Sequence, residues 1–256
     1  MINKSDITRF EYFFLLSDIK KIIPIKKLDV EDLSNFLFID EQKQLIFKNT
    51  KYFIQNKVAN NVLLWGERGN GKSSLILSTV NEINKSVKKK IKIIEVLSSD
   101  LNCLPQLVYK LSNISEKFII YIDDISFEKN EKNFKIFKVI LQGSMLSYCR
   151  NILFYTTSNI RNLSFSKNSN FNDIEFKDDQ NNILSLQERF GLKLGFHNFS
   201  KEQFLSLIIH YANKKKLKLS QKEIEKKSLN WSVQKGSFSG RVASQFVSNY
   251  LLNNSD

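Results

Sequence analysis

One motif constrains the fold of this chain more than any other feature: a glycine-rich loop that joins an apolar segment to a helical pattern. Residues 61–66 form a short apolar run, and residues 66–73 read Gly-Glu-Arg-Gly-Asn-Gly-Lys-Ser, which fits G-x-x-x-x-G-K-S without a mismatch. Glycine lets the backbone wrap closely around a phosphate, and the following helix points free N–H groups at the anion. This strand–loop–helix context predicts a phosphate-binding loop in an α/β protein.

The loop residues have predicted roles in binding a nucleotide. Lys72 should reach the β- and γ-phosphates, and Ser73 should ligate Mg²⁺. Gly69 adds a flexible point between Gly66 and Gly71. The other positions of the predicted cofactor site are Glu67, Arg68, Asn70 and Ser74. The alternative, a chance match in a basic chain, conflicts with the strand before the loop and the helical pattern after it.

Apolar strands alternate with helical stretches through the middle of the chain. After the strand at 61–66, further strands are expected at 91–97, 118–123, 152–157 and 192–196. The helices expected between them span 72–88, 104–111 and 134–148. This alternation predicts a parallel sheet with helices on both faces.

The flanking regions read differently. Apolar spacing predicts an amphipathic helix over residues 6–23, ended by Pro24, and a second helix over 40–57. Residues 160–186 are rich in Asn, Ser and Asp and are expected to form a surface excursion. Three C-terminal helices, expected at 200–215, 220–235 and 239–252, would form a lid. The predicted domains are a helical extension (1–27), a nucleotide-binding domain (28–198) and a helical lid (199–256).

Two carboxylates end the apolar run at residues 118–122. Desolvating adjacent charges is unfavourable unless a cation lies close, and a magnesium site at the end of a strand provides one. Asp123 would then hold the Mg²⁺, and Asp124 would orient and polarise the attacking water. Glu128 is a reserve candidate for the base, and a pair of turn aspartates is the alternative interpretation.

Several stretches together resemble a bacterial family of AAA+ ATPases catalogued as a domain of unknown function. They are residues 60–74, the Asp-Asp-Ile-Ser-Phe-Glu run at 123–128, Thr157-Ser158-Asn159, the Ser-Leu-Gln-Glu-Arg-Phe-Gly-Leu run at 185–192, and Ser239-Gly240-Arg241-Val242-Ala243. The resemblance extends from about residue 28 to the C-terminus and implies ATP and Mg²⁺ as cofactors. It also implies a five-stranded parallel sheet in the order 5-1-4-3-2, followed by a small helical lid.

The resemblance assigns three further residues to catalysis. Asn159 would be the sensor-1 residue that helps to hold the lytic water, with a turn asparagine as the alternative. Arg189 would be an arginine finger supplied to a neighbouring subunit, and Arg241 would be the sensor-2 residue through which the lid contacts the γ-phosphate. A surface salt bridge, for example to Glu188, is the alternative for Arg189, and a solvent-facing helix start is the alternative for Arg241.

Charge and cysteine content restrict the class of protein further. The net charge of +13 would suit a nucleic acid, an acidic protein or the nucleotide itself, and a general bias toward lysine is the alternative. Cys103 and Cys149 lie far apart without metal-type neighbours, so reduced thiols are expected. The apolar runs are too short to span a bilayer, and the N-terminus lacks a secretory pattern. We expect a cytoplasmic protein without membrane contact.

Three functions are compatible with these motifs. The first is a Mg²⁺-dependent AAA+ ATPase that changes conformation through its lid and assembles through Arg189. The second is a nucleotide-gated binding module, possibly associated with nucleic acid, in which hydrolysis is slow or absent because Asp124 is shorter than the usual glutamate. The third, a small-molecule kinase, is disfavoured because no acceptor-site signature is present.

Overall fold

The computed structural model describes residues 3–125, 131–141, 144–159, 186–217 and 221–253. Its strands are β1 Tyr12–Leu16, β2 Lys21–Pro24, β3 Val62–Gly66, β4 Lys92–Val96, β5 Phe118–Ile122, β6 Ile152–Ser158 and β7 Leu192–Phe196. Its α-helices are α1 Lys4–Arg9, α2 Asp40–Ile54, α3 Lys72–Ser86, α4 Leu104–Ser112, α5 Glu131–Leu141, α7 Lys201–Lys214, α8 Gln221–Lys235 and α9 Gly240–Leu252. Three short 3-10 helices are η1 Leu33–Asn35, η2 Ser98–Cys103 and η3 Met145–Tyr148. The predicted surface excursion at 160–186 lies almost entirely outside the described residues.

The described strands form one mixed sheet in the order β2-β1-β4-β5-β6-β3-β7. The prediction of a five-stranded, wholly parallel sheet is therefore wrong in strand number and in direction. β1 and β2 extend the sheet beyond β4, and β2 runs antiparallel to β1. The other five strands, β3 to β7, run parallel to one another. Numbered 1 to 5 along the chain from β3, they follow the predicted order 5-1-4-3-2.

The N-terminal segment departs most from the prediction. The single helix expected over residues 6–23 is wrong, because this stretch holds the short helix α1 and then the β1–β2 hairpin. Side chains along β1 alternate between buried and partly exposed, and Phe13 and Leu15 enter the core. A short apolar run is compatible with either a helical or a strand period, and pairing with β4 decides between them.

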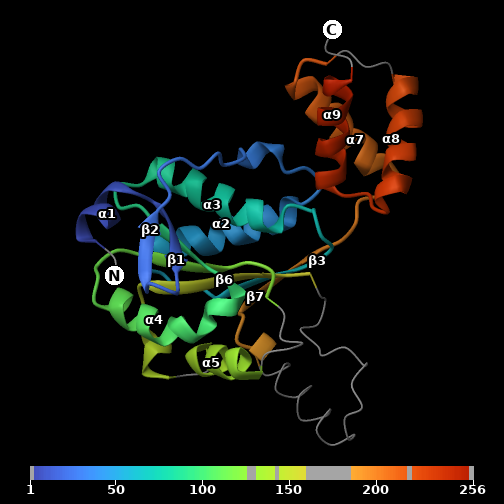
Figure 1. Cartoon of the computed structure of the whole chain (residues 1–256). Helices are drawn as coiled ribbons and strands as arrows, with labels where there is room; N and C mark the ends of the chain where they lie inside the picture. The colour runs from blue at the N-terminus through green and yellow to red at the C-terminus, as the bar shows by residue number, and fades with distance from the viewer. Residues whose placement is uncertain (1–2, 126–130, 142–143, 160–185, 218–220, 254–256) are drawn as a thin grey trace, which may run out of the picture.

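Helices cover both faces of the sheet, with α2 and α3 above it and α4 and α5 below it in Figure 1. Ile46 of α2 and Leu75 of α3 belong to the apolar cluster on the first face. Leu107 of α4 and Phe137 of α5 belong to the cluster on the second face. Because both faces are covered, all five residues of β5 are buried, which explains its uninterrupted apolar sequence.

Helices α7, α8 and α9 form a separate group beyond the end of the sheet (Figure 1). α7 begins with a capping box made by Ser200 and Gln203. Phe204 of α7 and Phe246 of α9 are buried within this group. The three predicted C-terminal helices are confirmed, with ends that differ by one residue. None of the helices in the described ranges combines the length and the apolar character needed to cross a bilayer.

Candidate nucleotide-binding site

The phosphate loop follows β3 and lies at the carboxyl edge of the sheet. Gly66 has φ of 122°, and a Cβ atom there would lie 2.0 Å from the carbonyl oxygen of Phe196 on the neighbouring strand. Gly71, with φ of 87°, precedes the first residue of α3 without a side-chain cap. The first turn of α3 contains no acidic residue. The loop backbone and the N-terminus of α3 therefore both favour the binding of an anion.

Lys72 is a buried cation held by oxygen atoms of its own chain. It is 6% exposed, and its Nζ donates to the carbonyl oxygens of Gly66 at 2.7 Å and Glu67 at 2.8 Å. A third bond, of 3.0 Å, goes to Oδ1 of Asn159. Burial lowers the pKa of Lys72, and the two aspartates that follow β5 partly oppose that shift. The structure thus brings the predicted phosphate-binding lysine and the predicted sensor-1 residue into contact.

Asp123 meets the phosphate loop at the first turn of α3. Its Oδ1 accepts hydrogen bonds from Ser73 Oγ at 2.7 Å and from Thr157 Oγ1 at 2.5 Å. Burial by itself raises the pKa of the Asp123 carboxyl, but hydrogen bonds, including those from these two hydroxyls, outweigh burial and lower it overall. The site therefore pairs an ionised carboxylate with a hydroxyl oxygen, and Mg²⁺ prefers such hard oxygen ligands.

Asp124 adopts a left-handed backbone conformation, with φ of 48°, that few non-glycine residues occupy. Its N–H donates to Thr157 Oγ1 at 2.8 Å, which anchors the turn. Its carboxylate accepts a hydrogen bond from Asn159 Nδ2, and Arg68 Nη2 lies 3.8 Å from its Oδ2. The Asp124 side chain is 50% exposed. Its carboxylate is thus oriented by neighbours and still accessible to water.

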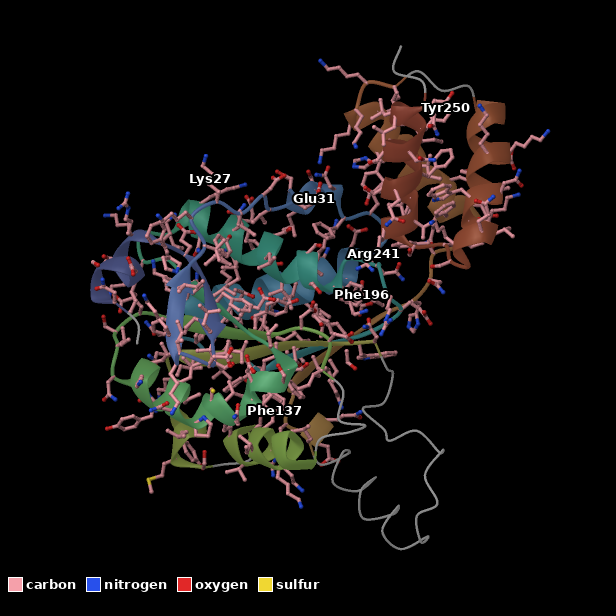
Figure 2. The ribbon with its side chains drawn as sticks, viewed as in Figure 1. Lys27, Glu31, Phe137, Phe196, Arg241 and Tyr250 are labelled. Atoms are coloured by element: carbon pink, nitrogen blue, oxygen red, sulfur yellow. The ribbon has the colours of Figure 1, made fainter. Side chains whose placement is uncertain are left out.

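The predicted lid, formed by helices α7, α8 and α9, contacts the phosphate loop through the start of α9. The backbone N–H of Arg241 donates to the carbonyl oxygen of Gly69 at 2.9 Å. Gly69 has φ of 81°, and a Cβ atom there would lie 2.9 Å from Cβ of Arg241 and 3.0 Å from Oγ of Ser239. Figure 2 shows Arg241 at the junction between the lid and the sheet domain. The close approach at Gly69 therefore serves the lid as well as the loop.

A cavity of about 570 Å³ connects these groups. Its lining includes loop residues, both aspartates, Asn159 and Arg241. It also includes the apolar and aromatic residues Phe36 and Leu37, which follow η1, and Leu207 and Tyr211 of α7. A cavity that combines charged groups with apolar, ring-bearing side chains has the lining expected for a nucleotide with its phosphates and base.

The polar side chains of the cavity fit a magnesium nucleotide. Lys72 and the N-terminus of α3 would face the phosphates, and Ser73 with Asp123 would ligate the metal. Among the predicted cofactor residues, Arg68, Gly69, Asn70, Gly71 and Ser74 also line the cavity. Gly66 and Glu67 lie behind Lys72 and hold its ammonium group through their carbonyl oxygens.

Arg189 lies elsewhere. It precedes β7 at the amino edge of the sheet and lines a different cavity, together with Arg150. Neither Arg189 nor Glu188 forms an ion pair with any residue in the described ranges, so the salt bridge between them, given as the alternative for Arg189, is not formed. Glu128, the reserve candidate for the base, lies outside the described residues.

The motifs did not reveal the role of every residue of the site. Thr157 bonds to both Asp123 and Asp124, although no role was predicted for it within the Thr157-Ser158-Asn159 run. Its place in β6, two residues before Asn159, was the signal that could have identified it. The apolar wall around Phe36 comes from a segment without regular pattern, and Tyr211 comes from the lid. Only folding brings these parts to the phosphate loop.

Comparison with known proteins identifies a family. A model of the family described as "Protein of unknown function (DUF815)" matches residues 8–254. The match covers nearly the whole chain and includes the phosphate loop, the acidic strand end and the lid.

Two curated proteins show more distant similarity. The probable mitochondrial chaperone BCS1-A of Dictyostelium discoideum is 27% identical over 209 residues, which cover 72% of this chain and 44% of that protein. The Holliday junction branch migration complex subunit RuvB of Mycoplasmopsis synoviae (strain 53) is 29% identical over 155 residues, which cover 60% of this chain and 45% of that protein. The aligned regions thus span less than half the length of these relatives.

Solved structures show the same fold. A single-residue variant of Thermotoga maritima RuvB matches with a TM-score of 0.59 at 16% identity, covering 85% of this chain and 63% of that one. The Aeropyrum pernix Orc1 protein in complex with DNA matches with a TM-score of 0.60 at 13% identity, covering 86% and 61%. At such identities the likeness shows the fold alone, an α/β P-loop fold of the AAA+ class.

Proposed function

The chain belongs to the DUF815 family, and from that premise we propose that it is a Mg²⁺-dependent AAA+ ATPase whose lid responds to the nucleotide. The observation that carries the proposal is the meeting of two distant motifs in one cavity. Ser73 of the phosphate loop donates to Asp123 at the end of β5 across 2.7 Å, fifty positions away in sequence. An AAA+ relative among the solved structures, the replication initiator DnaA, is bound to AMPPCP, which supports a nucleotide here.

The polar and charged side chains of the site would have separate roles in hydrolysis. Bound Mg²⁺ would neutralise charge on the phosphates, and Ser73 and Asp123 would hold it. Lys72 would exchange its bonds to loop carbonyls for bonds to phosphate oxygens. Asp124 and Asn159, which are hydrogen-bonded to each other, would orient the attacking water.

The lid would sense the phosphate through Arg241. This residue contributes its backbone to the contact with Gly69 and its side chain to the cavity wall. A ligand that contacts Arg241 therefore changes the balance between docked and undocked lid positions. In this proposal residues 28–198 form the nucleotide-binding domain, residues 199–256 form the lid, and residues 1–27 add β1 and β2 to the sheet.

Assembly belongs to the same proposal. Arg189 would act as an arginine finger on a neighbouring copy, and its place at the opposite edge of the sheet, away from its own nucleotide cavity, supports this role. The Mycoplasmopsis synoviae relative is named as a subunit of a complex. Solution mass with and without a slowly hydrolysed ATP analogue tests the assignment, and a monomer in both states would remove it.

Phosphate release by the purified protein, with and without Mg²⁺, tests the enzymatic proposal. We expect Asp124→Asn to lower the rate by about 10² to 10⁴, the usual contribution of a general base, while nucleotide binding persists. Glu82→Gln, at a partly exposed acid on α3 that pairs with Lys85, is the matched control. A wild-type protein that binds no ATP would end the proposal.

A second candidate function is a nucleotide-gated binding module with slow or absent hydrolysis. It is favoured by the environment of Asp124, whose carboxylate is engaged by Asn159 and lies near Arg68. A carboxylate oxygen that already accepts a hydrogen bond from Asn159 is less free to accept one from an attacking water. Tight ATP binding combined with a rate that Asp124→Asn does not change would favour this module over the ATPase.

A further inference from the structure

Strand β5 carries a buried hydroxyl that packing alone does not explain. Tyr121 is 3% exposed, and its Oη is shielded from solvent without a hydrogen bond to any residue that the structure describes. A buried polar group without a partner is unfavourable, because it has given up its hydrogen bonds to water. Phenylalanine would fill the same space without this cost. A tyrosine at this position therefore points to a use for its hydroxyl.

The neighbouring strand has a tyrosine whose hydroxyl is part of the fold. Tyr155 of β6 lies opposite Tyr121 in the register of the sheet. Its Oη accepts a hydrogen bond from Asn49 Nδ2 at 3.0 Å and forms a second, of 2.7 Å, with Thr50 Oγ1. Both partners belong to α2, so this hydroxyl connects a helix to the sheet. Within the described residues, the hydroxyl of Tyr121 has no such structural role.

Tyr121 lies beside the residues that are proposed to hold Mg²⁺. It precedes Asp123 by two positions, and residues two apart along a strand share one face. Tyr121 belongs to the apolar cluster that includes Leu75 of α3. Asp123 accepts a hydrogen bond from Ser73, in the first turn of the same helix. Both side chains are therefore on the side of the sheet that α3 covers.

The electrostatics of the two groups show that the hydroxyl is close to the carboxylate. Burial raises the pKa of the Tyr121 hydroxyl, and the charge of Asp123 raises it further. Burial also raises the pKa of the Asp123 carboxyl. Neighbouring hydroxyls lower that pKa, those of Thr157, Tyr121 and Ser73 in this order. Hydroxyls have such effects at short range, so Tyr121 Oη lies near Asp123 without a well-formed hydrogen bond to it.

A hydroxyl in this place suits the needs of a Mg²⁺ site. Mg²⁺ demands near-octahedral geometry, and the hydrogen bonds that a ligating carboxylate accepts fix its orientation. The hydroxyls of Ser73 and Thr157 already donate to Oδ1 of Asp123. The Tyr121 hydroxyl can still donate, because none of the described residues accepts its proton.

We propose that Tyr121 is a positioning residue for Mg²⁺: its hydroxyl hydrogen-bonds to the Asp123 carboxylate when the magnesium nucleotide is bound and fixes the orientation of that carboxylate. The inference rests on the proposed ATPase function and assigns Tyr121 a role that no motif indicates. Tyr121 does not line the nucleotide cavity, so it acts through Asp123 and makes no contact with the nucleotide itself.

The binding of a slowly hydrolysed ATP analogue, measured by titration calorimetry in Mg²⁺ and in EDTA, tests the role of Tyr121. With Mg²⁺, Tyr121→Phe should bind the analogue about tenfold more weakly than wild type, as expected when a group that orients a metal ligand is lost. In EDTA the two proteins should bind it equally. Equal binding in Mg²⁺ would overturn the proposal. An equal loss in Mg²⁺ and in EDTA would also overturn it, because positioning of a metal ligand requires the metal.

Tyr12→Phe is the matched control. The Oη of Tyr12 is also buried without a hydrogen bond to a described residue, but β1 is separated from β5 by β4. Tyr12→Phe should bind the analogue as wild type does in both buffers. The same loss with Mg²⁺ in both variants would overturn the proposal, because it would show that the effect does not depend on proximity to Asp123.

Thermal unfolding without nucleotide separates positioning from a structural role. Tyr155→Phe loses two hydrogen bonds and should lower the Tm by about 2 to 4 °C, whereas Tyr121→Phe should melt as wild type does. A Tm of Tyr121→Phe as low as that of Tyr155→Phe would assign Tyr121 to the fold and overturn the proposal. A wild type that binds no analogue in either buffer would refute the underlying ATPase function, and the role of Tyr121 with it.

Discussion

Lys72 and Arg150, one cation from each edge of the sheet, are held in opposite ways. Lys72 at the carboxyl edge is buried and bonded to three oxygen atoms of its own chain. Arg150 at the amino edge is exposed and has no ion-pair partner in the described parts of the chain. Burying a cation is unfavourable unless it is paired, whereas an exposed arginine is stabilised by water. Lys72 is therefore stabilised by its own chain, whereas the Arg150 side chain is stabilised by solvent.

Removal of the buried cation, Lys72, should have the largest effect on ATP affinity. Lys72→Ala should weaken ATP binding by about 100-fold, because hydrogen bonds between charged groups contribute up to about 3 kcal/mol. Titration calorimetry measures the change. Lys85→Ala, in the last turn of the same helix, should bind ATP as wild type does. Near-normal ATP affinity of Lys72→Ala would show that nucleotide binding at the carboxyl edge does not depend on Lys72.

Disruption of the contact between the lid and Gly69 should have an intermediate effect on ATP affinity. Gly69→Ala and Gly236→Ala both place a side chain at positive φ, of 81° and 67° respectively, at a strain of about 1 kcal/mol each. A Cβ atom at Gly69 meets Arg241 and Ser239, whereas at Gly236 nothing lies within 4 Å. Gly69→Ala should therefore bind ATP about tenfold more weakly than Gly236→Ala. Equal affinities would mean that the docked lid adds nothing to the nucleotide edge.

The pH dependence of ATP affinity should be the smallest effect. It should distinguish Lys72 at the carboxyl edge from the arginines at the amino edge. Burial lowers the pKa of Lys72, so its ammonium loses its proton at a lower pH than an ordinary lysine. Bound phosphate favours the charged form, and ATP affinity should fall about threefold as the pH rises from about 7 toward 10. Arginine stays charged throughout this range, so the amino edge should not respond.

Fluorescence titration of ATP across this pH range checks the prediction. Lys72→Arg, which keeps its charge, is the control and should show a flatter profile. A wild-type affinity that is independent of pH would mean that Lys72 remains charged without phosphate, contrary to the effect of its burial.

The carboxyl edge was largely predictable because its residues lie in continuous motifs. The strand before Gly66, the helix after Gly71 and the aspartates after β5 are each recognisable from neighbours in sequence. The parallel alternation also places strand ends at one edge, which accounts for the meeting of Asn159 with Lys72. The cavity that Arg189 lines at the amino edge was not predictable, because Lys57, Lys117 and Arg150, which also line it, belong to separate connections without a shared pattern.

The sequence by itself determined the phosphate loop, the acidic strand end and most helix and strand positions, because each depends on local backbone preferences and on periodic burial. Tertiary structure alone decided that residues 12–24 extend the sheet, that Phe36 and Tyr211 share one cavity wall, and that the amino-edge cations gather around one cavity. These outcomes depend on strand pairing and on contacts between distant segments. The periodicity of apolar residues indicates which face of a segment is buried, but it does not indicate which other segment covers that face.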